Sequence, residues 1–108
     1  MKKIYLACAY THPVKGVMEA RFLRINQIAG DLMRQGYMVF SPISHTHPIA
    51  VACDLPRGID FWQSYDETFI DWADELWVYS GFDYSHSVGV KREIAYALKA
   101  GKNVRIIQ

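Results

Sequence analysis

The segment KIYLACAYTHP (residues 3–13) changes character once, after Cys8. Residues 3–8 form a near-continuous apolar run, and polar and turn-forming residues follow at once. A short apolar run without polar alternation is typical of a parallel strand that is buried on both faces. The sequence therefore predicts that the chain begins with a buried strand of a parallel sheet.

Extended and helical patterns alternate through the rest of the chain. The predicted strands are residues 3–8, 37–41, 76–79 and 103–107, and the predicted helices are residues 14–35, 60–72 and 87–100. Ser87 suits a helix N-cap, and Gly36 and Gly101 suit helix C-termini. This order predicts a three-layer α/β fold, flavodoxin-like or Rossmann-like, with a parallel sheet of four or five strands and helices on both faces.

Residues 43–58 (ISHTHPIAVACDLPRG) show neither pattern clearly, and we expect an irregular segment there. A connection of about sixteen residues is longer than most loops, and such loops are commonly functional.

Composition narrows the classes of protein. The 108 residues predict one domain over 1–108; 51% are hydrophobic, 21% charged, and the net charge is +1. This balance argues against a nucleic-acid polymer or a membrane as partner. Without a signal peptide, a cytoplasmic protein is expected. Because a four-strand domain with 14% aromatic residues cannot easily cover both sheet faces, we expect a homo-oligomer, a dimer or tetramer.

Two acidic residues are candidates for catalysis. In parallel α/β sheets, ligands bind beyond the carboxyl ends of the strands. Glu93 falls at the edge of the apolar face of the last helix, and Asp66 lies near the apolar face of the preceding one. The alternatives are a boundary Glu paired with lysine and a solvated Asp.

Other candidates suit binding. Ser87 and Gly89, at a helix N-terminus, could offer backbone N–H groups to an anion, or could serve only as a cap. Tyr10 and Trp62 could stack on a base, or could belong to the core or an interface.

The dipeptide spacing of His45 and His47 would project both imidazoles to one side of an extended segment. With His12 or His86 they could form a metal site, but hydrogen bonding to substrate or plain loop packing are the alternatives. We expect no metal and no cofactor.

Four segments together resemble the nucleoside 2-deoxyribosyltransferases and the related deoxyribonucleoside 5′-monophosphate N-glycosidases. The segment from Ile4 to Tyr10 resembles the opening strand and turn, and residues 36–42 (GYMVFSP) resemble the second strand. Residues 66–78 resemble the acidic helix and the strand after it. Residues 87–95 (SVGVKREIA) resemble the motif that carries the nucleophile.

The resemblance implies a role for each matching residue. Glu93 would be the nucleophile, Asp66 the acid that protonates the leaving base, and Ser87 with Gly89 the group that holds a 5′-phosphate or 5′-hydroxyl. The turn at Ala9 and Tyr10 would line the base pocket. The expected function is cleavage or transfer at an N-glycosidic bond of a nucleoside or nucleotide, by the two-carboxylate chemistry of retaining glycosidases. The alternatives are a nucleotide-sensing module without catalysis and a metal hydrolase using the histidines.

Overall fold

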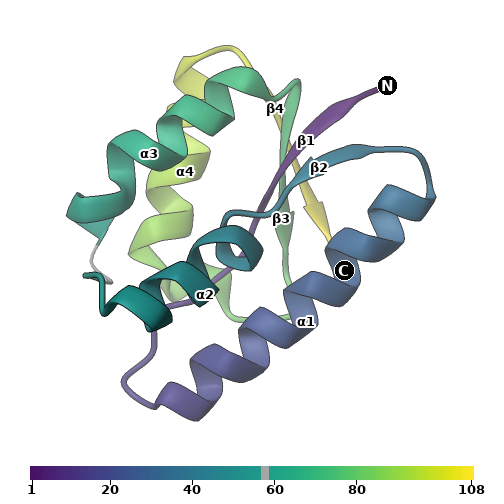
Figure 1. The fold of residues 1–108 in the computed structure, drawn as a ribbon. Coiled ribbons are helices and arrows are strands. Elements are labelled where there is room, and N and C mark those ends of the chain that lie inside the picture. Colours follow the sequence, from purple (N-terminus) through teal and green to yellow (C-terminus); the bar gives the residue numbers. More distant parts are fainter. Residues whose placement is uncertain (57–58) are drawn as a thin grey trace.

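The computed structural model describes residues 1–56 and 59–108, and one or more helices connect each strand to the next (Figure 1). The strands are β1 (Lys3–Ala7), β2 (Met38–Phe40), β3 (Glu75–Tyr79) and β4 (Asn103–Ile107). The α-helices are α1 (Lys15–Arg34), α2 (Pro42–Cys53), α3 (Ile59–Trp72) and α4 (Val88–Lys99), and a short 3-10 helix, η1 (Tyr84–His86), precedes α4.

The four strands form one parallel sheet in the order β2-β1-β3-β4. β1 and β3 are therefore central, with Tyr5 opposite Leu76 on one side and Phe40 on the other. The N-terminal end of β1 is tied to the turn before β3, because the Asp74 N–H donates to the Lys3 carbonyl over 2.8 Å. The predicted parallel α/β sheet is confirmed.

Helices cover both faces of this sheet. Ile4 and Leu6 of β1 pack against α1, with Ile25 and Ala29 among the helix residues in that core. The alternate residues of β1 face the other way, where α3 and α4 lie, and Tyr5 belongs to this second core. Because side chains alternate along a strand, Tyr5 points toward α4. Among the buried residues of this second core, Tyr5 is the one with a polar group on its side chain.

The prediction of an irregular segment from residue 43 is wrong, because Pro42–Cys53 form helix α2. Pro42 occupies the first helical position, where a missing N–H costs nothing. The helix continues through Pro48 and ends at Asp54, whose φ of 51° is left-handed. The sequence did not predict this helix, because it contains two prolines and because its apolar and polar residues are not separated onto different faces. Residues 57 and 58 of the expected loop lie outside the described residues.

The predicted ends of α4 differ in detail. Ser87 is the N-cap, and its Oγ accepts a hydrogen bond from the Val90 N–H at 3.2 Å, as expected. At the other end the cap is Ala100, and Gly101 follows it with a φ of 77°. Among residues 1–56 and 59–108, none of the helices has the length and hydrophobicity required to cross a bilayer.

Candidate active site

A cavity of about 550 Å³ opens at the carboxyl ends of β1 and β3. It lies where the β1–α1 connection, α2, α3 and the start of α4 meet. Seven of the eight residues predicted for the site line this cavity: Ala9, Tyr10, His47, Asp66, Ser87, Gly89 and Glu93. The fold therefore brings together, from four separate segments, nearly the whole predicted set.

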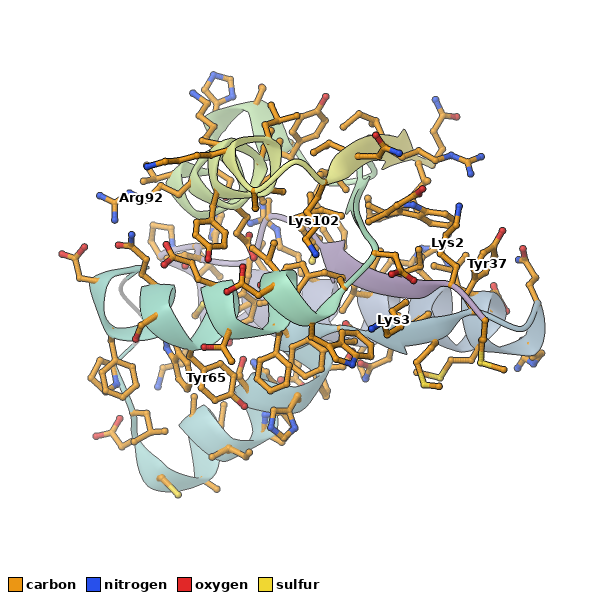
Figure 2. The ribbon with its side chains drawn as sticks, turned by 90° about the horizontal axis from the view of Figure 1, so that it is seen from above. Lys2, Lys3, Tyr37, Tyr65, Arg92 and Lys102 are labelled. Atoms are coloured by element: carbon orange, nitrogen blue, oxygen red, sulfur yellow. The ribbon has the colours of Figure 1, made fainter. Side chains whose placement is uncertain are left out.

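The two acidic candidates converge on one tyrosine. Glu93 comes from α4 and Asp66 from α3, and both side chains are half-buried in the cavity wall. The Tyr5 hydroxyl donates a hydrogen bond to Glu93 Oε2 and also interacts with the Asp66 carboxyl. Arg92 stands beside Glu93 on α4 but points to the outside, where it contacts Asp60 and Gln63 of α3 (Figure 2). Arg92 therefore pairs with residues outside the cavity, whereas the carboxyl groups of Glu93 and Asp66 interact with each other and with Tyr5.

Burial has the largest effect on the pKa of both carboxyl groups. Desolvation raises the pKa of Glu93 to about 8, against a hydrogen bond from Tyr5 that lowers it, and the charge of Asp66 raises it further. Desolvation also raises the pKa of Asp66 to about 6, again opposed by Tyr5. The two groups are close enough to titrate as a coupled pair. Between about pH 6 and pH 8 the pair therefore holds one proton.

Tyr5 was missed by sequence reasoning, which treated KIYLAC as plain core. The side chain is fully buried, and burial, followed by the charge of Glu93, raises the pKa of its phenol well above the ordinary value. The hydroxyl therefore stays protonated and acts as a donor. A signal was present, because a buried tyrosine in an aliphatic strand needs a partner for its hydroxyl.

The start of α4 forms a polar end of the cavity. Ser87 and Gly89 line it, together with Asp83 and His86 of the preceding connection. His86 Nδ1 pairs with Asp83 Oδ2 at the surface. Arg21 of α1 also lines the cavity, and its guanidinium donates to the Tyr10 carbonyl at 3.3 Å. This arginine fixes the backbone of the β1–α1 connection.

His45 and His47 do not share a side, contrary to the expectation for an extended segment. Because they lie two residues apart on helix α2, they point in nearly opposite directions. His47 lines the cavity, whereas His45 stacks against Tyr65 at a ring distance of 6.3 Å. Tyr65 lies between α3 and α2 in Figure 2, so His45 joins these helices.

The histidines considered as alternative metal ligands are not brought together in one group among the described residues. In the part of the chain that the structure describes, no three His, Cys, Asp or Glu side chains are grouped to hold a metal ion. Both ring nitrogens of His47 are engaged, Nε2 by Glu19 Oε2 at 2.7 Å and Nδ1 by the Tyr10 hydroxyl. The geometry does not support the metal-hydrolase alternative.

Apolar and aromatic groups line the remaining wall. Trp62 of α3 lines it, with its indole N–H donating to the Pro56 carbonyl at 2.8 Å. Ile43 and Ala50 of α2 complete this wall. Cys8 lies deeper, and burial raises the pKa of its thiol so far that it stays protonated. A flat, largely apolar ligand suits this wall, with the carboxyl pair near one edge of it.

Fold and site define a parallel α/β protein with a coupled carboxyl pair at the mouth of its sheet. The sequence matches, over residues 2–108, the family described as "Domain of unknown function (DUF1937)", and the chain belongs to that family. No curated protein matches the chain.

A solved structure with the same fold is that of a 2-deoxyribosyltransferase from the psychrotolerant bacterium Bacillus psychrosaccharolyticus. The two share 24% sequence identity, and the TM-score is 0.55. The match covers 96% of this chain and 70% of that chain. At this identity the likeness establishes a shared fold.

Proposed function

We propose that the protein cleaves the N-glycosidic bond of a nucleoside or nucleoside 5′-monophosphate, by way of a glycosyl-enzyme ester on Glu93. One observation carries the proposal: two carboxyl groups from different helices share the Tyr5 hydroxyl at a cavity large enough for a nucleoside. The fold shared with a 2-deoxyribosyltransferase supports it.

The chemistry follows from one proton on the pair. A Glu93 carboxylate oxygen attacks C1′, the C1′–N bond breaks, and its electrons leave with the base as Asp66 gives its proton to the base nitrogen. Water then attacks C1′, its proton passes to the Asp66 carboxylate, and the ester bond to Glu93 breaks. With a second base in place of water, the same ester gives transfer.

The ligand-free pair holds its proton mainly on Glu93, the group with the higher pKa. Reaction requires that proton on Asp66. Positive charge that develops at C1′ favours the Glu93 carboxylate, and the Tyr5 hydroxyl can pass a proton by donating to one carboxyl while it accepts from the other. Tyr5 then keeps the proton that it takes from Glu93, and Asp66 delivers to the leaving base the proton that it receives from Tyr5.

Base release and covalent trapping test this mechanism. The protein is incubated with the common deoxynucleosides and their 5′-monophosphates, and free base is measured by chromatography. Release by the native protein should fall at least about 1000-fold in Glu93→Ala, since the covalent route is lost. Rapid acid quenching and peptide mass spectrometry should find the sugar on the peptide that contains Glu93.

Three results would contradict the proposal. Release that survives Glu93→Ala unchanged removes the mechanism, and a sugar found on Asp66 reverses the roles of the two acids. A ligand that raises the melting temperature but is recovered intact indicates a nucleotide-sensing module, because any ligand bound only by the folded state stabilises it.

We further propose that the chain acts as a homo-oligomer. Ile49 and Val51 of α2 and Phe61 of α3 are large apolar side chains, 43%, 58% and 49% exposed. They lie on the two helices that form one wall of the cavity. Contact with a second copy would cover this surface.

A further inference from the structure

Behind the carboxyl pair lies a second, much smaller hollow. Asp66 and Glu93 line the cavity of about 550 Å³, and they also line a gap of about 10 Å³ between α3 and α4. Among the residues that the structure describes, these two alone belong to both hollows. The pair therefore lies between the cavity and the gap, and the mechanism proposed above uses only the cavity side.

The gap has the size and the lining of a site for one water molecule. A volume of about 10 Å³ is close to the smallest that holds a water, which also needs about two to four polar partners. Five of the six lining side chains are polar: Gln63, Asp66 and Glu67 of α3 and Arg92 and Glu93 of α4, with Ile70 as the apolar one. A water in the gap therefore has hydrogen-bond partners on both helices.

The gap reaches inward along one face of α3. Gln63, Glu67 and Ile70 lie three or four residues apart on that face, and they are exposed, half-buried and buried in that order. Arg92 and Glu93 of α4 line the gap from the other helix. The gap therefore connects the surface, at Gln63, with the carboxyl pair.

A hydrogen-bonded bridge crosses the outer end of the gap. Arg92 donates to Gln63 Oε1 at 3.0 Å, and Gln63 Nε2 donates to Glu67 Oε2 at 3.1 Å. The direction of these bonds is fixed, because a guanidinium can only donate and an ionised carboxylate can only accept. The Arg92 side chain is 47% exposed and points to the outside in Figure 2, so solvent reaches the bridge. The bridge holds the Glu67 carboxylate at the gap.

The charge on Glu67 acts on Asp66. Burial raises the pKa of Asp66 to about 6, the hydrogen bond from Tyr5 lowers it, and the Glu67 carboxylate raises it further. Asp66 in turn raises the pKa of Tyr5, Tyr65 and Glu93, in each case after burial as the main cause. Of these groups, Glu67 alone lines the gap and not the cavity. It is therefore placed to exchange a proton with Asp66 from the solvent side.

A bound nucleoside closes the other side of the pair. In the proposed reaction, C1′ lies against Glu93 and the base nitrogen against Asp66, so the nucleoside covers both carboxyl groups where they face the cavity. The reaction needs one proton on the pair, whereas a complex formed well above the Glu93 pKa of about 8 carries none. Such a complex becomes productive only when a proton reaches the pair by another path.

We propose that the gap between α3 and α4 holds a water that carries protons between the solvent and the carboxyl pair while a nucleoside fills the cavity. The proposal rests on the proposed function for the identity of that ligand. A proton from solvent binds a Glu67 carboxylate oxygen, and Glu67 passes it to the water as the water gives one of its own protons to the Asp66 carboxylate. Loss of a proton follows the reverse path. Glu67 acts only through Asp66, and it is a positioning residue.

Trapping of a bound substrate across a pH jump tests this route. The substrate is whichever of the common deoxynucleosides and their 5′-monophosphates the protein cleaves fastest, labelled in the base. Protein and labelled substrate are mixed at pH 9 and then diluted rapidly into pH 7 buffer that contains a large excess of the same substrate without label. Labelled base released in the first turnover counts the complexes that gained a proton before the substrate left.

This trapped fraction is divided by the fraction found when the whole experiment is done at pH 7. In the native protein the ratio should be close to one. Because each protein is compared with itself at constant pH, changes in substrate binding or in the chemical step affect both fractions alike.

Variants of Glu67 locate the route. Glu67→Leu, whose side chain has no acid–base group, should lower the ratio at least about 10-fold. Glu67→Gln keeps a polar partner for Gln63 and should lower the ratio in the same way, so the test does not depend on the folding of one variant. Asp71→Leu removes a carboxylate one turn further along α3, which bonds Tyr96 and does not line the gap, and it should leave the ratio near one.

The outcomes separate this proposal from the proposed function. Base release with a native ratio near zero, or a ratio that both Glu67 variants leave unchanged, overturns the proton route and leaves the glycosidase intact. If no base is released, nuclear magnetic resonance of Ile70 decides, because this residue lines the gap and is only 1% exposed. A rotating-frame Overhauser cross-peak between water and the Ile70 methyl groups, lost in Glu67→Leu and kept in Asp71→Leu, supports the water site without catalysis. No cross-peak, or one that survives Glu67→Leu, overturns it.

Discussion

Tyr5 is the residue of strand β1 that contacts both carboxyl groups of the cavity. Its hydroxyl has a single proton, and two carboxyl groups compete for it. The hydrogen bond lowers the pKa of both Glu93 and Asp66, while burial raises both. The residue therefore sets the pH range over which the pair holds one proton.

Replacing Tyr5 should move the pH dependence of activity. In the native protein, kcat/KM should be bell-shaped, with limbs near pH 6 and pH 8. Tyr5→Phe removes the donor that favours ionisation, so the pKa of both acids rises and both limbs should move to higher pH. Base release measured from pH 4 to pH 10 checks this. Tyr37→Phe is the matched control, and an unshifted profile in Tyr5→Phe would contradict the role assigned to the hydroxyl.

Glu93 should also make the folded protein less stable at alkaline pH. Because its pKa is about 8 when folded and near 4.5 when unfolded, the folded state holds a proton between these values that the unfolded chain has released. The stability that this proton provides is complete below about pH 4.5 and is lost as the pH rises to about 8.

Glu93→Gln should remove that loss. The amide cannot ionise, so the variant should exceed the native protein by on the order of 3 kcal/mol at pH 9 and by little at pH 5. Urea unfolding at both values measures the difference. Asp31→Asn, which removes an exposed carboxylate, should show no such dependence. A Glu93→Gln difference that is equal at pH 5 and pH 9 would count against the raised pKa.

The residues differed in how far sequence reasoning could place them. Glu93 stood out because it lies at the edge of the apolar face of the last helix, and Asp66 because it lies near the apolar face of the preceding helix. Tyr5 and Glu19 were missed, because only the fold brings them to their partners. Glu93 lies 88 residues from Tyr5 in the chain, and His47 lies 28 residues from Glu19. His45 and His47 were recognised as a pair, but their relative direction depended on a helix that was not predicted.

At the scale of elements, α1, α3 and α4 were each predicted to within one residue at either end, whereas α2 was not predicted. α4 has a capping serine, a contrasting apolar face and a glycine after its end. α2 has little contrast between faces and contains Pro48, so propensity argues against it. It forms because Pro42 can begin a helix and because Thr46 and His47 are buried against the rest of the molecule. Such tertiary burial cannot be derived from local pattern.

The cap of α4 gives a prediction about this element. Ser87→Ala loses the bond to the Val90 N–H and should lower the free energy of unfolding by about 1 kcal/mol. Ser87→Asp restores a cap and should recover the stability, but it places a negative charge at the polar end of the cavity. It should therefore lower kcat/KM for 5′-monophosphates more than for nucleosides.

Urea unfolding and the two substrate classes provide the measurements. Ser85→Ala removes a nearby exposed hydroxyl, which bonds Asp83, and serves as the control for stability. If Ser87→Asp affects nucleosides and 5′-monophosphates equally, then the start of α4 does not hold the phosphate.

For the whole molecule, the alternation of strands and helices predicted the architecture and the edge of the sheet where the cavity lies. The strand order and the assignment of α1 to one face and α3 with α4 to the other came from the structure. Light scattering tests the proposed oligomer. Val51→Glu on α2 should lower the molar mass to that of one chain, whereas Leu98→Glu on α4 should not. A native protein that is monomeric at high concentration contradicts it.

The bond between Tyr5 and Glu93 joins nearly opposite ends of the polypeptide, 88 residues apart. During synthesis the phenol leaves the ribosome long before its carboxyl partner does, so a partly made chain lacks the proposed catalytic pair. Closing so distant a contact is slow, because the loop entropy is spent before the contact stabilises the chain. On refolding from denaturant, helical circular dichroism should therefore return early, and turnover should return only with the last kinetic phase.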